Sequence, residues 1–150
     1  MAQEDKKLLL KDLCQRQMYN VKCQVFNDVN PYTLSGILHN KPHSQLYFEE
    51  LDWKECDGFV NVEYCKPYLF PLSSMTEEQE KEISERYNYH NYFGLCIEIT
   101  NHSEGYWDKD TSCNLQDYLW LEDWYNKNHF DYRGLIEKGL AIDATGLNIY

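Results

Sequence analysis

Two histidines, His39 and His43, stand four residues apart, which is the spacing of two zinc ligands on one face of a helix. Pro42 lies between them, and a proline inside a helix removes a hydrogen bond and clashes with the preceding turn. We therefore interpret the pair as loop histidines. We expect no metal ion and no other cofactor in this protein.

A group of acidic residues further along the chain begins like a calcium-binding loop. Asp108 and Asp110 occupy its first and third positions, and carboxylate oxygens are the ligands that calcium prefers. Such a loop also needs a glycine at its sixth position and a glutamate at its twelfth, where this chain has Cys113 and Leu119. We therefore interpret these carboxylates as solvated. Serine-hydrolase motifs and glycine-rich phosphate loops are also missing from the sequence, which predicts no catalytic residues and a protein that is not an enzyme.

Aromatic side chains are the remaining candidates for recognition, because the chain has 13 Tyr and 4 Trp. A buried tyrosine hydroxyl needs a hydrogen-bond partner, so this excess favours some tyrosines at the surface, where they are common in interfaces. Tyr106 and Trp107 follow a predicted strand and are our candidate binding residues. Arg86 is the candidate partner for a phosphate group of a ligand.

The charge of the chain excludes one class of partner. The formal net charge is −11, from 25 acidic and 14 basic residues, and it repels a nucleic-acid backbone. We therefore expect no direct nucleic-acid binding. An acidic surface suits a basic protein partner, although acidity more often serves solubility. The 150 residues, 43% of them hydrophobic, are typical of a single folded domain, 1–150.

The cysteines and the apolar runs indicate the compartment. None of the spacings gives the CxxC pair of zinc sites and redox motifs. An apolar run of only three residues, at 8–10, follows the N-terminus, so we expect no secretory signal, a cytoplasmic location and reduced thiols. No run approaches the roughly 18 residues of a transmembrane helix, so we expect no membrane partner. The six cysteines are Cys14, Cys23, Cys56, Cys65, Cys96 and Cys113.

The elements that would position these residues predict an α+β fold. An apolar face predicts an N-terminal helix over 6–18. The β-rich part, 20–66, is expected to form a small antiparallel sheet or an SH3-like barrel, because a flat sheet of that size leaves its edges open. Its alternating residues predict a loop at 39–44 and four strands, at 21–26, 32–38, 45–48 and 59–64.

The second part, 76–150, is predicted to mix helices with single strands. Thr76 and Gln79 have the spacing of a capping box at the start of a helix that ends near Tyr87. A further strand is expected at 95–100. A C-terminal helical pair follows, with helices over 115–127, capped by Asn114, and over 131–138, capped by Asp131 and ended by Gly139, before a closing apolar strand at 140–142.

Three stretches carry a resemblance to a known family: LLLKDLC at 8–14, KPYLFPLSSMTEE at 66–78 and HFDYRGLIEKGLA at 129–141. Together they resemble a family of small uncharacterised proteins of gut anaerobes and of their phages and mobile elements. The resemblance spans most of the chain. It implies a genomic setting but no activity and no catalytic residues. The polar loop at 101–113 and the tail at 145–150 depart from the family pattern.

The third stretch has two interpretations. The capping pattern of Asp131 and Gly139 favours an architectural role. The alternative makes Tyr132 and Arg133 an exposed anchor pair, since these residue types are enriched in interface hot spots.

We therefore expect a non-enzymatic interaction protein of a phage or mobile element, which binds and inhibits or modulates a host protein, plausibly of a defence system, through an acidic and Tyr/Trp-rich surface. The alternative is a small-molecule binder that sequesters a nucleotide signal, with Arg86 or Arg133 on the phosphate. Only three arginines are present, which disfavours this alternative. An enzyme ranks third, because a site assembled in space is invisible in one sequence.

Overall fold

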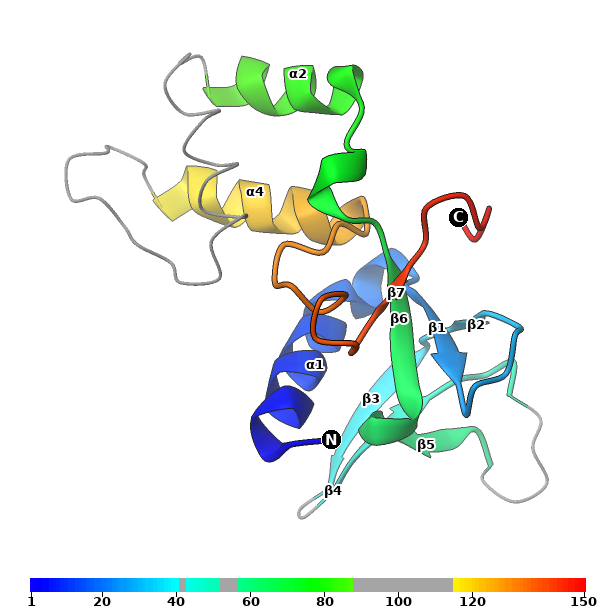
Figure 1. Cartoon of the computed structure of the whole chain (residues 1–150). Coiled ribbons are helices and arrows are strands. Elements are labelled where there is room, and N and C mark those ends of the chain that lie inside the picture. Colours follow the sequence, from blue (N-terminus) through cyan, green and yellow to red (C-terminus); the bar gives the residue numbers. More distant parts are fainter. Residues whose placement is uncertain (41–42, 52–56, 88–114) are drawn as a thin grey trace.

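The computed structural model describes residues 1–40, 43–51, 57–87 and 115–150. In this part of the chain, helices combine with two small sheets, so the expected α+β class is confirmed (Figure 1). The predicted strand at 95–100 and the predicted cap Asn114 lie outside the described residues. Every described helix is too short or too polar to cross a lipid bilayer.

The described strands form two sheets, and the segment 32–40 runs from one sheet into the other. The first has the strand order β2-β1-β6-β7 and the second the order β3-β4-β5. The predicted strand at 32–38 bends at Leu34 and Ser35, so that β2 belongs to the first sheet and β3 to the second. The strands are β1 (Lys22–Val25), β2 (Tyr32–Thr33), β3 (Gly36–Asn40), β4 (His43–Tyr47), β5 (Phe59–Asn61), β6 (Cys65–Leu69) and β7 (Ile142–Asp143).

Two predictions in the β-rich part were wrong. The expected loop at 39–44 is the end of a hairpin, because Asn40 pairs with His43 and only two residues connect β3 to β4. This segment is polar, so its sequence lacks the apolar alternation that would have indicated the two strands. The expected strand at 59–64 ends at Asn61, and a 3-10 helix, η2 (Val62–Tyr64), turns the chain into β6.

The helices are α1 (Gln3–Arg16), α2 (Glu77–Tyr87) and α4 (Leu115–Lys127), with short 3-10 helices at Gln17–Tyr19 (η1) and Leu72–Ser74 (η3). The capping box is confirmed. The Thr76 amide donates to Gln79 Oε1 at 2.9 Å, and the Gln79 amide donates to Thr76 Oγ1 at 3.3 Å. The pair satisfies two amides at the start of α2.

The second member of the predicted helical pair is absent from the structure. Residues 131–139 form consecutive turns, because Gly134 adopts a left-handed φ of 69° that interrupts a helix. Gly139, with φ 67°, ends the turns as the sequence predicted. The closing strand β7 then pairs in parallel with β6, with Tyr68 opposite Ile142.

Two apolar clusters hold the chain together. The larger one lies between the sheets, α1 and the C-terminal turns, and includes Leu9, Leu13, Cys23, Cys65 and Leu135, each with no exposed surface. The smaller one joins α2 and α4 through Ile83, Trp124, Tyr125 and Phe130. Cys23 and Cys65 are thus small buried apolar residues, as expected, whereas Cys14 is exposed and forms no disulfide with another described cysteine.

Candidate functional site

A completely buried ion pair lies on the inner face of α1. Asp12 and Arg16 are one helical turn apart, and Arg16 Nε donates to Asp12 Oδ2 at 2.7 Å. The other guanidinium nitrogens reach backbone carbonyls near the end of α4 and beyond it. Arg16 Nη2 donates to Phe130 O at 2.7 Å and Nη1 to Tyr125 O at 3.4 Å. The pair therefore links α1 to the segment that follows α4.

Arg133 extends this pair toward the surface. Its Nη1 lies 2.8 Å from Asp12 Oδ1, and its Nη2 lies 2.7 Å from Glu122 Oε1 on α4. Nη2 also donates to Gln15 Oε1. Two guanidinium groups, of Arg16 and Arg133, therefore meet two carboxylates, so the formal charges balance. A buried arginine needs this neutralisation, because an unpaired charge in a low dielectric is strongly unfavourable.

Tyr132 closes the network. Its ring stacks on Tyr125 with centroids 5.3 Å apart, and Arg133 Cζ lies 4.4 Å from the ring centroid. Burial raises the pKa of Tyr132 above its usual range, so the hydroxyl keeps its proton and donates to one acceptor at a time. The acceptors within reach are Glu122 Oε1 (3.2 Å), Asn126 Oδ1 (3.3 Å) and Gln15 Oε1 (3.4 Å).

Asp131 fixes the backbone that carries these two side chains. Its carboxylate accepts hydrogen bonds from the amides of Leu135 at 2.9 Å and Ile136 at 2.7 Å. The same segment is held to the residue after β6, because the Phe70 amide donates to His129 O at 2.9 Å and the Asp131 amide donates to Phe70 O at 2.8 Å. The predicted capping role of Asp131 is therefore present without the predicted helix.

We define the charge network as Asp12, Gln15, Arg16, Glu122, Tyr132 and Arg133. It is a poor candidate for catalysis, because every charge in it is neutralised. The exposed anchor pair that the sequence allowed is wrong, since the Arg133 side chain is only 9% exposed. No group of three metal-binding side chains occurs among the described residues. The network joins α1, α4 and the C-terminal turns.

The other sequence candidates lie elsewhere. Arg86, near the end of α2, is exposed, and its Cζ lies 5.5 Å from the Trp120 ring centroid on α4. This cation–π contact joins the two helices. Tyr106 and Trp107 lie outside the described residues. The structure thus brings Tyr132 and Arg133 together, and Arg86 lies on a different element.

Sequence reasoning missed a buried histidine. The ring of His129 stacks on Tyr150 with centroids 3.9 Å apart, and its Nδ1 has no hydrogen-bond partner among the described residues. Burial lowers the pKa of His129 to about 4, with a smaller contribution from the charge of Arg16. The ring is therefore neutral at pH 7. Tyr150 is held in place because its hydroxyl donates to Tyr68 O at 2.8 Å and accepts from the Lys22 amide at 3.1 Å.

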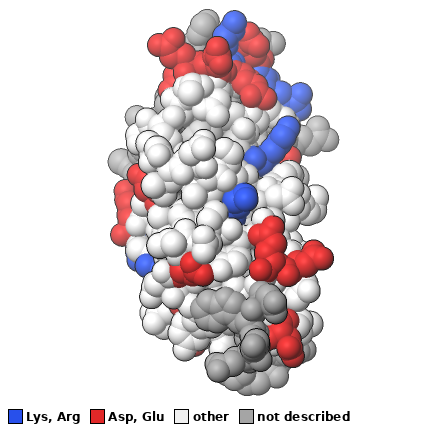
Figure 2. Space-filling view, turned by 90° about the vertical axis from the view of Figure 1, so that its right-hand side faces the viewer, with Lys and Arg blue, Asp and Glu red and all other residues white. Residues whose placement is uncertain are grey.

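Exposed acidic side chains lie along α2. Figure 2 shows Asp and Glu side chains at the end of the molecule that α2 forms, with Lys and Arg side chains beside them, and further acidic side chains lower on the same face. Five of its residues are glutamates, and Ile83 is its one buried side chain among the residues whose burial is described. Lys81 pairs with Glu85 at 3.5 Å, and both side chains are mostly exposed. The outer face of α2 is therefore negative, and its charges make few contacts with the part of the chain that the structure describes.

Comparisons with protein-family models, with curated proteins and with solved structures each found no match. The resemblance to proteins of gut anaerobes and their phages therefore stays a prediction.

Proposed function

We propose that the protein is a non-enzymatic interaction protein that binds a basic protein partner through its acidic surface, with α2 at the centre of that surface. In the setting of a phage or mobile element, the partner is a host protein that is inhibited or modulated, plausibly one of a defence system. The observation that carries the proposal is the outer face of α2, where exposed glutamates have few partners among the described residues.

The contrast in charge pairing supports this proposal. The described arginines that lie inside the protein are matched by carboxylates, whereas α2 leaves an excess of negative charge in solvent. Such an excess steers a positively charged partner and raises its association rate. It contributes little to stability, because exposed ion pairs are worth about 0–1 kcal/mol.

The nucleotide binder remains the alternative, and the arginines disfavour it. All three arginines are described, and Arg16 and Arg133 are bound to carboxylates. Arg86 is left for a phosphate group, and it already lies over Trp120. A thermal-shift screen with cyclic dinucleotides tests this alternative, because a ligand that binds only the native state raises the melting temperature.

The test of the proposal is a pull-down from host lysate with two charge-matched variants. The α2 variant carries Glu78→Lys, Glu82→Lys and Glu85→Lys. The control variant carries the same change at three exposed glutamates on other elements, Glu4, Glu49 and Glu137. Each substitution adds two charges, so three of them change the formal net charge from −11 to −5 in both variants.

We expect a host protein that the wild type and the control variant retain in stoichiometric amount and the α2 variant loses. Circular dichroism establishes that both variants are folded. Equal retention by the two variants would contradict the role of α2, and retention of nothing by the wild type would contradict the proposed function.

A further inference from the structure

The segment 145–150 is attached to the rest of the described fold through Tyr150. Residues 145–148 are exposed, and their hydrogen bonds are local, within 143–147. Among the described residues, the segment's hydrogen bonds to distant partners are those of the Tyr150 hydroxyl. This hydroxyl donates to Tyr68 O at 2.8 Å and accepts from the Lys22 amide at 3.1 Å. One side chain is therefore the main anchor of the segment.

The ring of Tyr150 contacts two other aromatic rings. The His129 ring stacks on it with centroids 3.9 Å apart and planes at 12°, and the Phe70 centroid lies 5.9 Å away. Burial raises the pKa of Tyr150 above its usual range, so the hydroxyl keeps its proton and can donate and accept at once. We define the phenol slot as the Lys22 amide, the Tyr68 carbonyl and the rings of Phe70 and His129.

The two backbone groups of the phenol slot belong to the ladder between β1 and β6. At the far end of this ladder, the Phe26 amide donates to Tyr64 O at 3.0 Å. In an antiparallel ladder, hydrogen-bonded pairs recur at every second residue of each strand. Four residues back along β1, the register places Lys22 opposite Tyr68. A regular ladder would therefore have a direct bond from the Lys22 amide to Tyr68 O.

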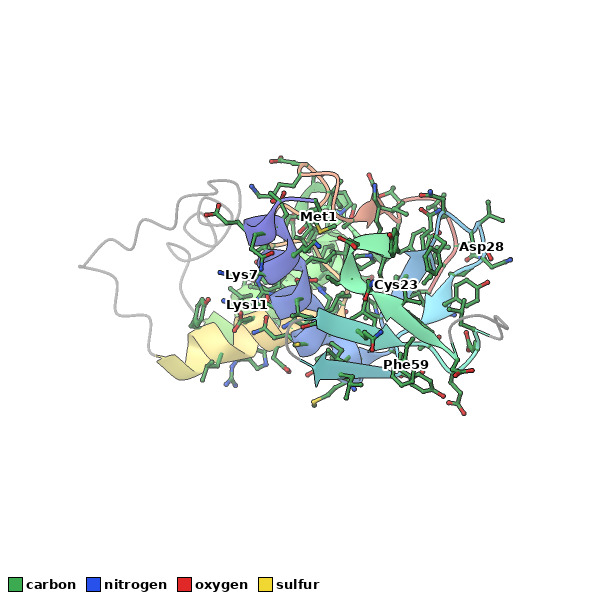
Figure 3. All side chains as sticks on the ribbon, turned by 90° about the horizontal axis from the view of Figure 1, so that it is seen from below. Met1, Lys7, Lys11, Cys23, Asp28 and Phe59 are labelled. Carbon is green, nitrogen blue, oxygen red and sulfur yellow. The ribbon has the colours of Figure 1, made fainter. Side chains whose placement is uncertain are left out.

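The Tyr150 hydroxyl takes the place of this bond. The pairing of β1 with β6 stops one residue earlier, where Cys23 lies opposite Pro67, and Cys23 lies in the interior of the molecule (Figure 3). The hydroxyl bridges the amide and the carbonyl as a bound water molecule would. When it leaves, the two groups face each other and can bond directly. Its departure therefore leaves neither backbone group without a partner.

His129 is placed in the phenol slot at a cost to the fold. Its backbone has a left-handed φ of 59°, which is uncommon for a residue other than glycine. The residue is only 9% exposed, and Nδ1 has no hydrogen-bond partner among the described residues. Strain and unpaired buried polar atoms concentrate at functional sites. An apolar ring at this position would stack on Tyr150 without the unpaired nitrogen, so packing alone does not explain the slot.

We propose that the phenol slot is an exchangeable binding site for a tyrosine side chain, which Tyr150 occupies from within the chain and a tyrosine of another polypeptide can replace. The slot selects this residue type by its polar groups. Phenylalanine lacks the hydroxyl, and the tryptophan N–H can donate but cannot accept. Tyr150 is still 43% exposed although its hydroxyl lies between two strands, so a tyrosine enters hydroxyl first and its backbone stays outside. This site is independent of the acidic face of α2.

The test uses a labelled peptide with the sequence of residues 143–150, and the same peptide with phenylalanine in place of its tyrosine. Fluorescence anisotropy measures binding to the full chain, at protein concentrations up to about 1 mM, the range of the effective concentration of a short tether. The variant Tyr150→Ala opens the slot. The control Leu147→Ala shortens a side chain of the same segment that is 48% exposed. Circular dichroism establishes that both variants are folded.

We expect the tyrosine peptide to bind Tyr150→Ala at least about tenfold more tightly than it binds the wild type or Leu147→Ala, because Tyr150 competes from within the chain. The phenylalanine peptide should bind Tyr150→Ala about tenfold more weakly than the tyrosine peptide, because the two hydrogen bonds of the hydroxyl are lost. Equal binding of the two peptides, or no binding to Tyr150→Ala, would overturn the site. No binding to the wild type would overturn the exchange.

Sedimentation velocity then identifies the source of the tyrosine. The net charge of −11 opposes association of two copies, so the measurement is made at 0.15 M salt, where the Debye length is about 8 Å. Dimers of the wild type that Tyr150→Ala does not form would assign the tyrosine to a second copy. A monomeric wild type that binds the peptide would assign it to a different protein. Loss of the host protein by the α2 variant tests the proposed function separately, because that variant leaves the phenol slot intact.

Discussion

The charge network and the outer face of α2 use the same types of residue in opposite ways. In the network, each guanidinium group contacts carboxylates at 2.7–3.1 Å, and the central pair is completely buried. On α2, glutamates outnumber basic residues, and the Lys81–Glu85 pair is mostly exposed. We therefore expect the buried charges to affect stability, and we propose that the charges on α2 serve a partner. Substitutions in the two regions should differ accordingly.

The largest effect is expected for Arg16→Met. This substitution leaves Asp12 with one cation fewer and removes the donors that Phe130 O and Tyr125 O accept. Loss of one partner of a buried ion pair costs about 3–5 kcal/mol, so we expect a fall of this size in the free energy of unfolding. Urea denaturation measures it. A loss below about 1 kcal/mol would show that the network is not a stability element.

The next effect is a dependence of stability on pH through His129. The pKa of His129 is about 4 in the folded protein and 6.5 for an unperturbed histidine, so the unfolded chain binds more protons between these values. Stability is therefore complete above pH 6.5 and is lost as the pH falls toward 4, by about 3 kcal/mol in total.

The matched variant His129→Phe should remove this contribution. Urea denaturation of both proteins at several pH values between 7.5 and 4.5 measures the difference between them. Parallel pH curves for the wild type and the variant would contradict the assignment to His129.

A smaller effect is expected at the start of α2. Thr76→Ala removes the hydroxyl that accepts the Gln79 amide, and loss of such a cap typically costs about 1 kcal/mol. Thermal unfolding with far-UV circular dichroism measures the change. Thr76→Ser keeps the hydroxyl and should behave like the wild type; equal destabilisation by both variants would assign the effect to the lost methyl group.

The smallest effect is expected for Lys81→Ala, which breaks the exposed pair with Glu85. Exposed pairs on a helix contribute about 0.3–0.5 kcal/mol, so the free energy of unfolding should change by no more than that. The same substitution makes α2 more negative and should strengthen retention of the host partner. A stability loss as large as that of Arg16→Met would remove the distinction between the two regions.

Local signals in the sequence predicted the elements well. The capping box of Thr76 and Gln79 and the alternation in β1 needed only short-range patterns, and both are present. Asp131 and Gly139 were correctly assigned as cap and stop, but Gly134 between them adopts a left-handed φ. The cap and stop residues at the two ends of 131–139 therefore did not determine the backbone conformation between them.

The charge network was only partly accessible from the sequence. Asp12 and Arg16 lie on the same face of α1 as the apolar Leu9 and Leu13, and charged residues on an apolar face signal a buried ion pair. That signal was available. The contact with Arg133 was not, because Arg133 lies 121 positions after Asp12 in the sequence and no local pattern indicates so distant a contact.

The hydrogen bond from Arg16 to the carbonyl of Phe130 can form only late in the synthesis of the chain. These residues are 114 positions apart, and ribosomes add about 5–20 residues per second, so α1 precedes its acceptor by roughly 6–23 seconds during synthesis. During this interval the Arg16 guanidinium group has Asp12 nearby but neither of its backbone carbonyl acceptors, Tyr125 O and Phe130 O. The N-terminal helix must therefore remain hydrated or be held by a chaperone until the distant segment emerges.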